Sequence, residues 1–336
     1  MKKKSTIRPL LTVAIPAYNV AEFLERAVVP VTRAKYTNLI EIIIINDGSK
    51  DDTAKIGKNL EKTFANVRTI NKENGGHGST INVGIEHANG EYFRLLDGDD
   101  YFNTNKLDKF LEKLKEETSD IILTPFIQNY IGNGLVNYIN FYSRMIDGKK
   151  YKLDSFEFGS EGLLLPCTTV KTDLVKKSSY KIDEHCFYVD QEYNMFLYML
   201  ANSASYYDIP VYHYQIGREG QSMTTESLKK NIHHHETVVV RLLEEYTKKQ
   251  DSLAPAKNKH IVDQIITPLC QLHYDLTAIS NQDRQHFLSF DKKLKEYPNF
   301  YNSELIAGKS IKMYRKTGGR LMKPTRVARK FFGKIK

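Results

Sequence analysis

The stretch Glu41-Ile-Ile-Ile-Ile-Asn46, followed at once by Asp47-Gly48-Ser49, decides the fold class of this chain. Four consecutive isoleucines leave no polar side for solvent, so they predict a strand that is buried on both faces. Strands of this kind occur in parallel sheets that helices cover on both sides. The earlier run Leu11-Thr-Val-Ala-Ile-Pro16 has the same character and predicts a second such strand.

Helical and extended segments alternate along the first hundred positions. A helix is expected from Val20, another from Asp51 onward, and a third over residues 79–88, where Asn89-Gly90 ends it. A weak strand is expected over residues 67–70. This alternation predicts an α/β protein with a doubly wound, largely parallel sheet.

Polar side chains follow three of the predicted strands at the point where each strand ends. These are Tyr18, Asp47 and Asp97. In open α/β sheets, ligands bind outside the carboxyl ends of the strands. The sequence therefore predicts a ligand site along this edge.

The segment Glu91-Tyr-Phe-Arg-Leu-Leu-Asp97-Gly98-Asp99-Asp100 predicts a largely apolar strand that is followed directly by three aspartates. Carboxylates held together repel each other and need a counter-charge. A hard divalent cation supplies one and also binds phosphate oxygens. The segment thus indicates a metal that holds a diphosphate. The alternative is a solvated turn in which Asp100 caps the next helix.

Taken together, four motifs resemble the family 2 glycosyltransferases of GT-A fold. They are Ile15-Pro16-Ala17-Tyr18-Asn19, Ile45-Asn46-Asp47-Gly48-Ser49, Asn74-Gly75-Gly76 and Leu96-Asp97-Gly98-Asp99-Asp100, and a later loop extends the match to Ser222. The resemblance implies a Rossmann-like, nucleotide-sugar-binding mixed sheet with helices on both faces.

The resemblance also implies roles for the matched residues. Asp47 would accept a hydrogen bond from the base, Asp99 and Asp97 would bind Mn²⁺ or Mg²⁺, and His213 would approach the metal. The alternative for His213 is a strand residue in an aromatic patch. The implied contacts with the nucleotide-sugar are Pro16, Ala17, Tyr18, Asn19, Asp47, Ser49, Gly75, Gly76, Asp97, Gly98, Arg218 and Ser222.

Two positions raise the question of charge at this site. Many relatives carry Arg where this chain has Ile81, so another cation must substitute if that Arg touches phosphate. His77 is the candidate for this cation. The alternative is that His77 is an exposed histidine in a loop, without such a role. Arg94 either neutralises the acidic cluster from behind or simply packs in the sheet.

The segment Phe187-Tyr188-Val189-Asp190-Gln191-Glu192 precedes an apolar helix. The family has an acidic pair here whose Asp is the general base, and this chain keeps only the second acid, Asp190. Asp190 as a helix cap is one alternative, and Glu192 as the base is another. One base without a second nucleophile predicts single displacement with inversion.

The expected function is therefore an inverting glycosyltransferase that moves a sugar from a UDP-sugar to a hydroxyl of a glycan or lipid-linked acceptor in cell-surface polysaccharide synthesis. A catalytically silent nucleotide-sugar-binding module is the alternative from the binding class. A phosphohydrolase of the haloacid dehalogenase type is a further alternative, but the Thr of its Asp-x-Asp-Gly-Thr pattern is missing here.

Length and composition suggest three regions: a catalytic domain over residues 1–225, a helical appendage over residues 226–300 and a basic tail over residues 301–336. The helical appendage is expected to select the acceptor or to pair with a second copy. From Leu305 onward there are eleven Lys and Arg and no acid, in a chain of net charge +9.

The last residues of the tail predict an amphipathic helix. Phe331 and Phe332 share one face, and Lys and Arg occupy the other. Such a helix suits an anionic membrane surface, with a solubilising tail as the alternative. Nucleic acid is not expected, because no nucleic-acid-binding motif accompanies the charge. An odd number of cysteines, three, without a secretion signal or an apolar span predicts a cytoplasmic protein with reduced thiols. Together with the tail, this predicts a peripheral protein at the inner face of the cell membrane.

Overall fold

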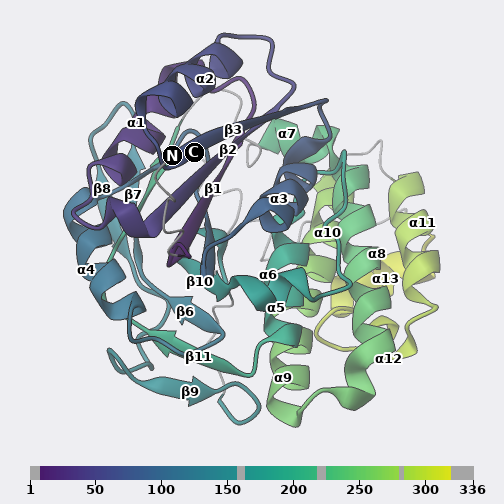
Figure 1. Ribbon diagram of the computed structural model, residues 1–336. Coiled ribbons are helices and arrows are strands. Elements are labelled where there is room, and N and C mark those ends of the chain that lie inside the picture. Colours follow the sequence, from purple (N-terminus) through teal and green to yellow (C-terminus); the bar gives the residue numbers. More distant parts are fainter. Residues whose placement is uncertain (1–7, 157–162, 218–224, 280–283, 319–336) are drawn as a thin grey trace. The chain divides into compact units, whose positions relative to one another are not determined.

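The computed structural model describes residues 8–156, 163–217, 225–279 and 284–318 (Figure 1). The chain forms two compact units, Met1–Arg218 and Glu219–Lys336. The predicted donor contacts Arg218 and Ser222, and the predicted tail from residue 319 onward, lie outside the described residues.

The first unit is built on a mixed sheet of eight strands. Four neighbouring strands on one side are parallel, whereas β10 runs antiparallel to both of its neighbours. In spatial order the strands are β3 (Val67–Lys72), β2 (Ile40–Asp47), β1 (Leu11–Ala17), β4 (Tyr92–Leu95), β10 (Thr168–Lys171), β6 (Ile121–Leu123), β11 (Ser203–Tyr206) and β9 (Lys150–Lys152).

The two apolar runs found in the sequence form the centre of this sheet. All seven residues of β1 are buried, and the four consecutive isoleucines of β2, residues 42–45, are 0% exposed. β1 lies between β2 and β4 and is parallel to both, and Ala17 pairs with Asn46. Strands β1 and β2 therefore end together, at the edge where the sequence predicts ligand binding.

Helices cover both faces of this sheet. Figure 1 shows α1 and α2 on one side of β1–β3 and α3 on the other. This arrangement confirms the predicted fold class. The helices of the first unit are α1 (Ala21–Thr32), α2 (Thr53–Thr63), α3 (Gly76–His87), α4 (Thr104–Leu114), α5 (Thr172–Lys176) and α6 (Asp190–Leu200), with short 3₁₀ turns at Thr37–Leu39 and Leu165–Cys167.

A second, four-stranded sheet belongs to the first unit and was not predicted from the sequence. Its spatial order is β5 (Tyr101–Phe102), β12 (Tyr212–Ile216), β7 (Phe126–Tyr130) and β8 (Val136–Ile139). One face of this sheet is core: Phe102 and Tyr212 are 0% exposed and Phe126 is 3% exposed. The strand β5 begins directly after Asp100, so this sheet starts at the acidic segment.

The second unit is helical, as predicted. His235 and His273 stack in its interior with ring centroids 5.3 Å apart, and Arg315 pairs with Asp291 at 2.7 Å. No helix in the described ranges has the length and apolar character to cross a bilayer. The helices are α7 (Thr225–Lys230), α8 (Ile232–Lys249), α9 (Pro255–His260), a π-helical turn (Ile261–Ile266), α10 (Thr267–Ile279), α11 (Arg284–Leu294), α12 (Pro298–Tyr301) and α13 (Lys309–Lys316), with a 3₁₀ turn at Gln250–Ser252.

Candidate active site

The loops that follow β1 and β2 are joined by hydrogen bonds at the carboxyl edge of the sheet. The backbone N–H of Asn19 donates to Oγ of Ser49 at 3.0 Å, and Oδ1 of Asn19 accepts from the N–H of Lys50 at 2.8 Å. Asn19 has φ 51°, a left-handed conformation that Asn tolerates better than most residues. The adjacent Tyr18 is 47% exposed, so its ring is available to a ligand at this edge.

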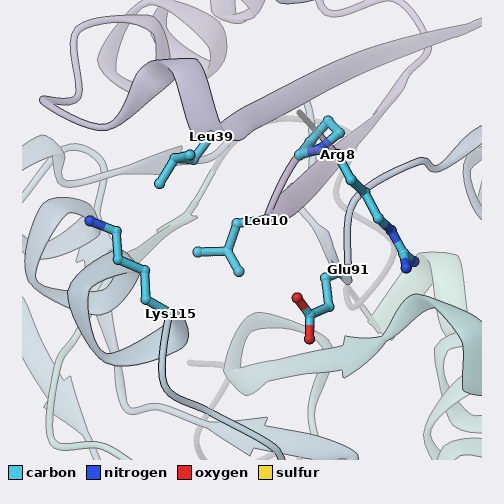
Figure 2. Close-up of a pocket in the computed structure, with 6 residues that line it drawn as sticks. Arg8, Leu10, Leu39, Glu91 and Lys115 are labelled. Carbon is cyan, nitrogen blue, oxygen red and sulfur yellow. The ribbon is translucent and has the colours of Figure 1, made fainter. Parts of the chain in front are cut away.

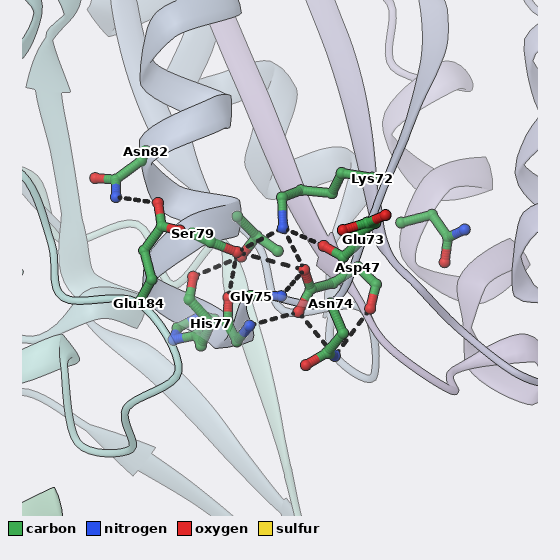
Figure 3. Close-up of polar contacts among 12 residues, drawn as sticks. Asp47, Lys72, Glu73, Asn74, Gly75, His77, Ser79, Asn82 and Glu184 are labelled. Carbon is green, nitrogen blue, oxygen red and sulfur yellow. Dashed lines mark hydrogen bonds and ion pairs between the residues drawn. The ribbon is translucent and has the colours of Figure 1, made fainter.

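Asp47 is the centre of a hydrogen-bond network (Figure 3). Its Oδ1 accepts from Nζ of Lys72 at 2.8 Å and from the N–H of Gly75 at 2.9 Å. Its Oδ2 accepts from the N–H of Gly76 at 2.8 Å and from Nδ2 of Asn74 at 3.1 Å. The side chain is 3% exposed. Asp47 therefore organises the glycine loop, and a bond from a base to this carboxylate stays a prediction.

The glycines of this loop are required by close contacts. A Cβ on Gly75 would lie 2.6 Å from Oγ of Ser79, and Gly76 has φ +81°. The carbonyl of Gly75 accepts a hydrogen bond from the N–H of His185 at 2.5 Å. The segment that leads to Asp190 is thus attached to the same loop that Asp47 organises.

The three carboxylates after β4 differ in environment. Asp97 and Asp99 are half-buried, whereas Asp100 is 0% exposed. Asp100 accepts from the hydroxyl of Tyr212 at 2.6 Å and from the N–H of Gln215 at 2.7 Å. Burial, followed by the charges of Asp97 and Asp99, raises the pKa of Asp100 well above its usual value. Asp100 therefore joins β12 to the end of β4.

The capping alternative for Asp100 is wrong. Helix α4 begins at Thr104, and its cap is Asn103, whose side chain accepts from the N–H of Lys106 at 3.1 Å. The acidic segment is therefore not explained as the start of a helix.

His77 lies in the first turn of α3 beside the acidic cluster. Its Nε2 is 3.3 Å from Oδ1 of Asp97. Burial lowers the pKa of His77, but Asp97, Asp190 and Asp99 together outweigh burial and raise the pKa above its usual value. Ile81, one turn later, is 0% exposed. The raised pKa favours the protonated imidazole, and a role of His77 as counter-charge stays a prediction. The exposed-loop alternative does not hold, because His77 is half-buried in α3.

Asp190 is the first residue of α6. Its Oδ2 accepts from Nε2 of Gln191 at 2.9 Å. Burial raises the pKa of Asp190, and the nearby charge of His77 partly opposes that rise. The helix cap is Val189, without a side-chain capping bond, so the capping alternative for Asp190 is wrong. The structure brings Asp190 into the electrostatic environment of His77 and Asp97.

Glu192 has a structural contact instead. It is 0% exposed, and its Oε2 accepts from the N–H of Asp183 at 2.9 Å. This bond holds the loop that precedes α6. Asp190, in contrast, is linked electrostatically to His77 and Asp97 of the acidic cluster.

Arg94 packs in the sheet. It is 0% exposed, its guanidinium lies 5.3 Å from the ring of Phe102, and within the described ranges it forms no ion pair. Burial lowers its pKa to about 10. The packing alternative is therefore the correct one. Its hydrogen bonds go to Oγ1 of Thr169 and Oγ1 of Thr124, both at 3.0 Å, and to the carbonyl of Pro166 at 2.7 Å.

His213 lies in an aromatic contact. Its ring stacks on Tyr101 with centroids 4.7 Å apart, and its Nδ1 is 3.2 Å from Nδ2 of Asn129. Burial lowers its pKa. Among the described residues, no three His, Cys, Asp or Glu side chains form a group that could hold a metal ion. A role of His213 as ligand stays a prediction.

Two residues of the site were missed in the sequence. Nζ of Lys72 contacts both Asp47 and Oγ of Ser79, the latter at 2.9 Å. Lys72 ends β3, so the strand-end argument applied to β1, β2 and β4 could have found it. Ser79 had no such signal, because it was expected only as the start of a helix.

The pocket drawn in Figure 2 lies elsewhere. It has a volume of about 330 Å³ and lies at the amino end of β1, opposite the acidic cluster. It is open and carries charges of both signs, and none of the residues discussed above lines it. Its lining residues are Arg8, Pro9, Leu10, Leu39, Glu91 and Lys115.

Comparisons with known proteins agree with this geometry. The model of glycosyl transferase family 2 matches residues 12–176. An uncharacterised glycosyltransferase of Rickettsia typhi is 30% identical over 254 residues, which cover 74% of this chain and 76% of that protein. The glycosyltransferase GlyG of Streptococcus pneumoniae is 26% identical and covers 65% of this chain and 74% of its own length.

Solved structures share the fold. Staphylococcus aureus TarS in complex with UDP-GlcNAc matches with a TM-score of 0.67 and 18% identity, covering 92% of this chain and 88% of that one. The mannosyltransferase PcManGT from Pyrobaculum calidifontis, in complex with GDP-Man and Mn²⁺, matches with a TM-score of 0.50 and 14% identity, covering 93% and 86%.

Proposed function

This chain belongs to glycosyl transferase family 2 and is a glycosyltransferase of GT-A fold, and from that premise we propose that it uses a UDP-sugar to glycosylate a hydroxyl of a glycan with inversion. The observation that carries the proposal is the convergence of His77, Asp97 and Asp190 at the carboxyl edge of the sheet. TarS, which shares the fold, is solved with UDP-GlcNAc and with UDP.

A role in polysaccharide synthesis has separate support. The chondroitin synthase of Pasteurella multocida is 35% identical over 117 residues, which cover 34% of this chain and 12% of that protein. The proposed acceptor is accordingly a glycan, free or lipid-linked.

The donor site uses the loops that the structure joins. Tyr18 offers an exposed ring to the base. The N–H groups of Gly75 and Gly76 donate to Asp47, so the start of α3 would attract phosphate through its positive helix dipole and the side chain of His77 rather than through these two N–H groups. The diphosphate would therefore lie between α3 and the end of β4.

A divalent cation fits the residues present. Asp97 and Asp99 supply hard oxygen ligands. Their charges add to the effect of burial in raising the pKa of Asp100, so a cation at this position would offset repulsion. The fold neighbour PcManGT is solved with Mn²⁺. Asp99 and Asp97 would hold Mn²⁺ or Mg²⁺, which when bound neutralises charge on the leaving diphosphate.

Asp190 is proposed as the general base. The acceptor oxygen forms a bond to the anomeric carbon, the bond from that carbon to the diphosphate oxygen breaks, and the hydroxyl proton passes to Asp190. Burial raises the pKa of Asp190, which makes it a stronger base than an exposed aspartate. With one base and no second carboxylate as nucleophile, the configuration at the anomeric carbon inverts.

The site of action in the cell is also a proposal. The concentration of Lys and Arg after Leu305, together with Phe331 and Phe332, supports peripheral attachment to an anionic membrane from the cytoplasmic side. The helices of residues 226–300 are a candidate surface for a homo-oligomer.

The test is UDP release from a panel of UDP-sugars, with and without Mn²⁺ or Mg²⁺, in the presence and absence of a glycan acceptor. We expect release from at least one UDP-sugar that requires the metal and rises with acceptor. Thermal stabilisation by a UDP-sugar without any release would instead identify a silent binding module. No stabilisation and no release with any UDP-sugar would contradict the choice of nucleotide.

A further inference from the structure

The four-stranded sheet brings four side chains into one row across its strands. Tyr101 of β5 is paired with His213 of β12, His213 with Ile127 of β7, and Ile127 with Tyr138 of β8. Residues that oppose each other directly on neighbouring strands point to the same face of a sheet. These four residues, called the outer row here, therefore share a face.

The outer row lies on the face away from the core. The neighbouring row on the other face is Phe102, Tyr212 and Phe126, which are at most 3% exposed. Side chains alternate between the faces of a strand. Tyr101, His213 and Ile127 are accordingly half-buried, and Tyr138 is 48% exposed.

The outer row begins at the proposed active site. Tyr101 directly follows Asp100 in the chain, and Arg26, which contacts the ring of Tyr101, also donates to the carbonyl of Asp99. A ligand that leaves the reaction centre along this sheet would meet these side chains in order.

The chemistry of the outer row fits a neutral sugar chain. No member is acidic, Lys or Arg. The rings of Tyr101 and His213 stack on each other, and the amide of Asn129 lies 3.2 Å from His213. Tyr138 presents a ring that is 48% exposed. Flat rings with a few hydrogen-bonding groups suit the C–H faces and hydroxyls of pyranoses.

Charged side chains contact the two ends of the outer row. The guanidinium of Arg26 lies 5.7 Å from the ring of Tyr101 and donates to the carbonyl of Asp99 at 2.7 Å. At the far end the hydroxyl of Tyr138 donates to Asp208. Arg26 and Asp208 thus contact only the end members of the row, Tyr101 and Tyr138.

We propose that the outer row is a subsite for the acceptor, where it binds neutral hexose units of the glycan beyond the unit that receives the new sugar. The inference rests on the proposed function. Neighbouring strands are about 4.8 Å apart, so each strand adds one side chain to a track along which successive sugars can lie. A longer acceptor would therefore bind more tightly than a monosaccharide.

The experiment measures binding of neutral oligosaccharides to the full chain in the presence of UDP and Mn²⁺. The probes are N-acetylglucosamine oligomers and maltose-series oligomers of increasing length, and the readout is ligand-observed NMR. For wild type we expect affinity to rise with length. Tyr138→Ala should weaken the longest bound oligomer by about three- to tenfold, the worth of one aromatic stack.

Two further variants control the result. Tyr138→Phe keeps the ring and should bind as wild type, which separates stacking from the loss of the bond to Asp208. Ile146→Ala removes an apolar side chain that is 61% exposed but off the row, and it should change nothing. Melting curves check that each variant is folded.

Three outcomes would overturn the subsite. The first is that wild type binds none of the probes, and the second is that wild type and Tyr138→Ala bind them with equal affinity. The third is that wild type sediments as a dimer and Tyr138→Ala as a monomer, which would show that a second copy covers this face. A wild-type protein that binds neither UDP nor any UDP-sugar would instead contradict the proposed function.

Discussion

The imidazole of His77 and the carboxylate of Asp97 meet across two elements, with Nε2 3.3 Å from Oδ1. His77 lies in the first turn of α3, and Asp97 follows shortly after the end of β4. Because α3 begins where the glycine loop stops, the position of His77 depends on the network around Asp47. The raised pKa of His77 favours a protonated imidazole beside carboxylates that would otherwise repel one another.

The first prediction concerns this cation. His77→Gln should weaken binding of the UDP-sugar in the presence of Mn²⁺ by about tenfold. This factor is the lower end of the contribution that a hydrogen bond to a charged group makes to the free energy of binding. His77→Arg, which keeps a positive charge, should lose less. Calorimetric titration with the donor measures both. Wild-type affinity in His77→Gln would contradict the assignment of His77 as a cation of the donor site.

The second prediction concerns the metal. Asp99→Ala should reduce the affinity for UDP measured with Mn²⁺ to the value measured without metal, because it removes a ligand at the surface. The melting temperature should hardly change. Asp52→Ala, at an aspartate whose side chain is 70% exposed, is the matched control. If UDP affinity still responds to Mn²⁺ in Asp99→Ala, the metal is held elsewhere.

The third prediction separates the two carboxylates of α6. Asp190→Asn should slow turnover by about 10²–10⁴, the usual effect of a general base, while donor affinity stays close to wild type. Glu192→Gln should instead lower the free energy of unfolding, because Glu192 is buried and accepts from the N–H of Asp183. Turnover and urea unfolding are measured for both. A folded Glu192→Gln without activity, beside an active Asp190→Asn, would exchange the two roles.

The fourth prediction concerns acid stability of the helical unit. His235 and His273 are buried with Nδ1 atoms 3.2 Å apart. Burial lowers the pKa of His235 to about 4, and burial followed by the charge of His235 lowers that of His273. The unfolded chain, with histidine pKa values of about 6.5, therefore binds more protons than the folded one below that pH.

Stability of this unit should be full above the unfolded pKa and should be lost as pH falls, by up to about 1.4 kcal/mol per pH unit for each histidine. Two charged side chains lie near this pair. Oε2 of Glu236 is 3.8 Å from Nε2 of His273, and Nζ of Lys293 is 2.8 Å from Oε1 of Glu236. Urea unfolding at pH 7.5 and 5.5 gives the change in the free energy of unfolding with pH. If His273→Phe shows the same change as wild type, the acid sensitivity comes from other groups.

The fifth prediction concerns the tail. Removal of residues 324–336 should abolish sedimentation with anionic liposomes, since each Lys or Arg near such a surface contributes about 1 kcal/mol. Salt should weaken the binding of the full chain. Replacement of Phe331 and Phe332 by Ser should weaken it further, through loss of buried apolar area. Equal sedimentation of full-length and truncated chains at low salt would direct attention to the helices before the tail.

The central strands and the edge that carries the site could be predicted from the sequence. The isoleucines of β2 admit only a doubly buried strand, and a polar residue after such a strand must lie at its carboxyl end. By contrast, β5 has two residues and β7 and β8 show no clear alternation, so the smaller sheet has no local signal. It is held by long-range pairs such as Tyr212 with Asp100.

Contacts made by the main chain explain what else was missed. Asp47 was expected to face a base, but its partners include the backbone N–H groups of Gly75 and Gly76. Backbone groups are present at almost every position, so the sequence does not indicate which of them a carboxylate will bind. Arg94 could not be assigned from its own strand, because Thr124 and Thr169 come from distant segments. Pairwise contacts of this kind depend on the completed fold.

The glycine loop has a consequence for how this chain tolerates change. The carbonyl of Gly75 accepts from the N–H of His185, so the link between the glycine loop and the segment before Asp190 is made by backbone atoms, whereas the loop itself is held by the side chain of Asp47. Backbone bonds survive most side-chain replacements. Replacements at neighbouring positions should therefore leave this link intact, and intolerance should be concentrated at Asp47, Gly75 and Gly76.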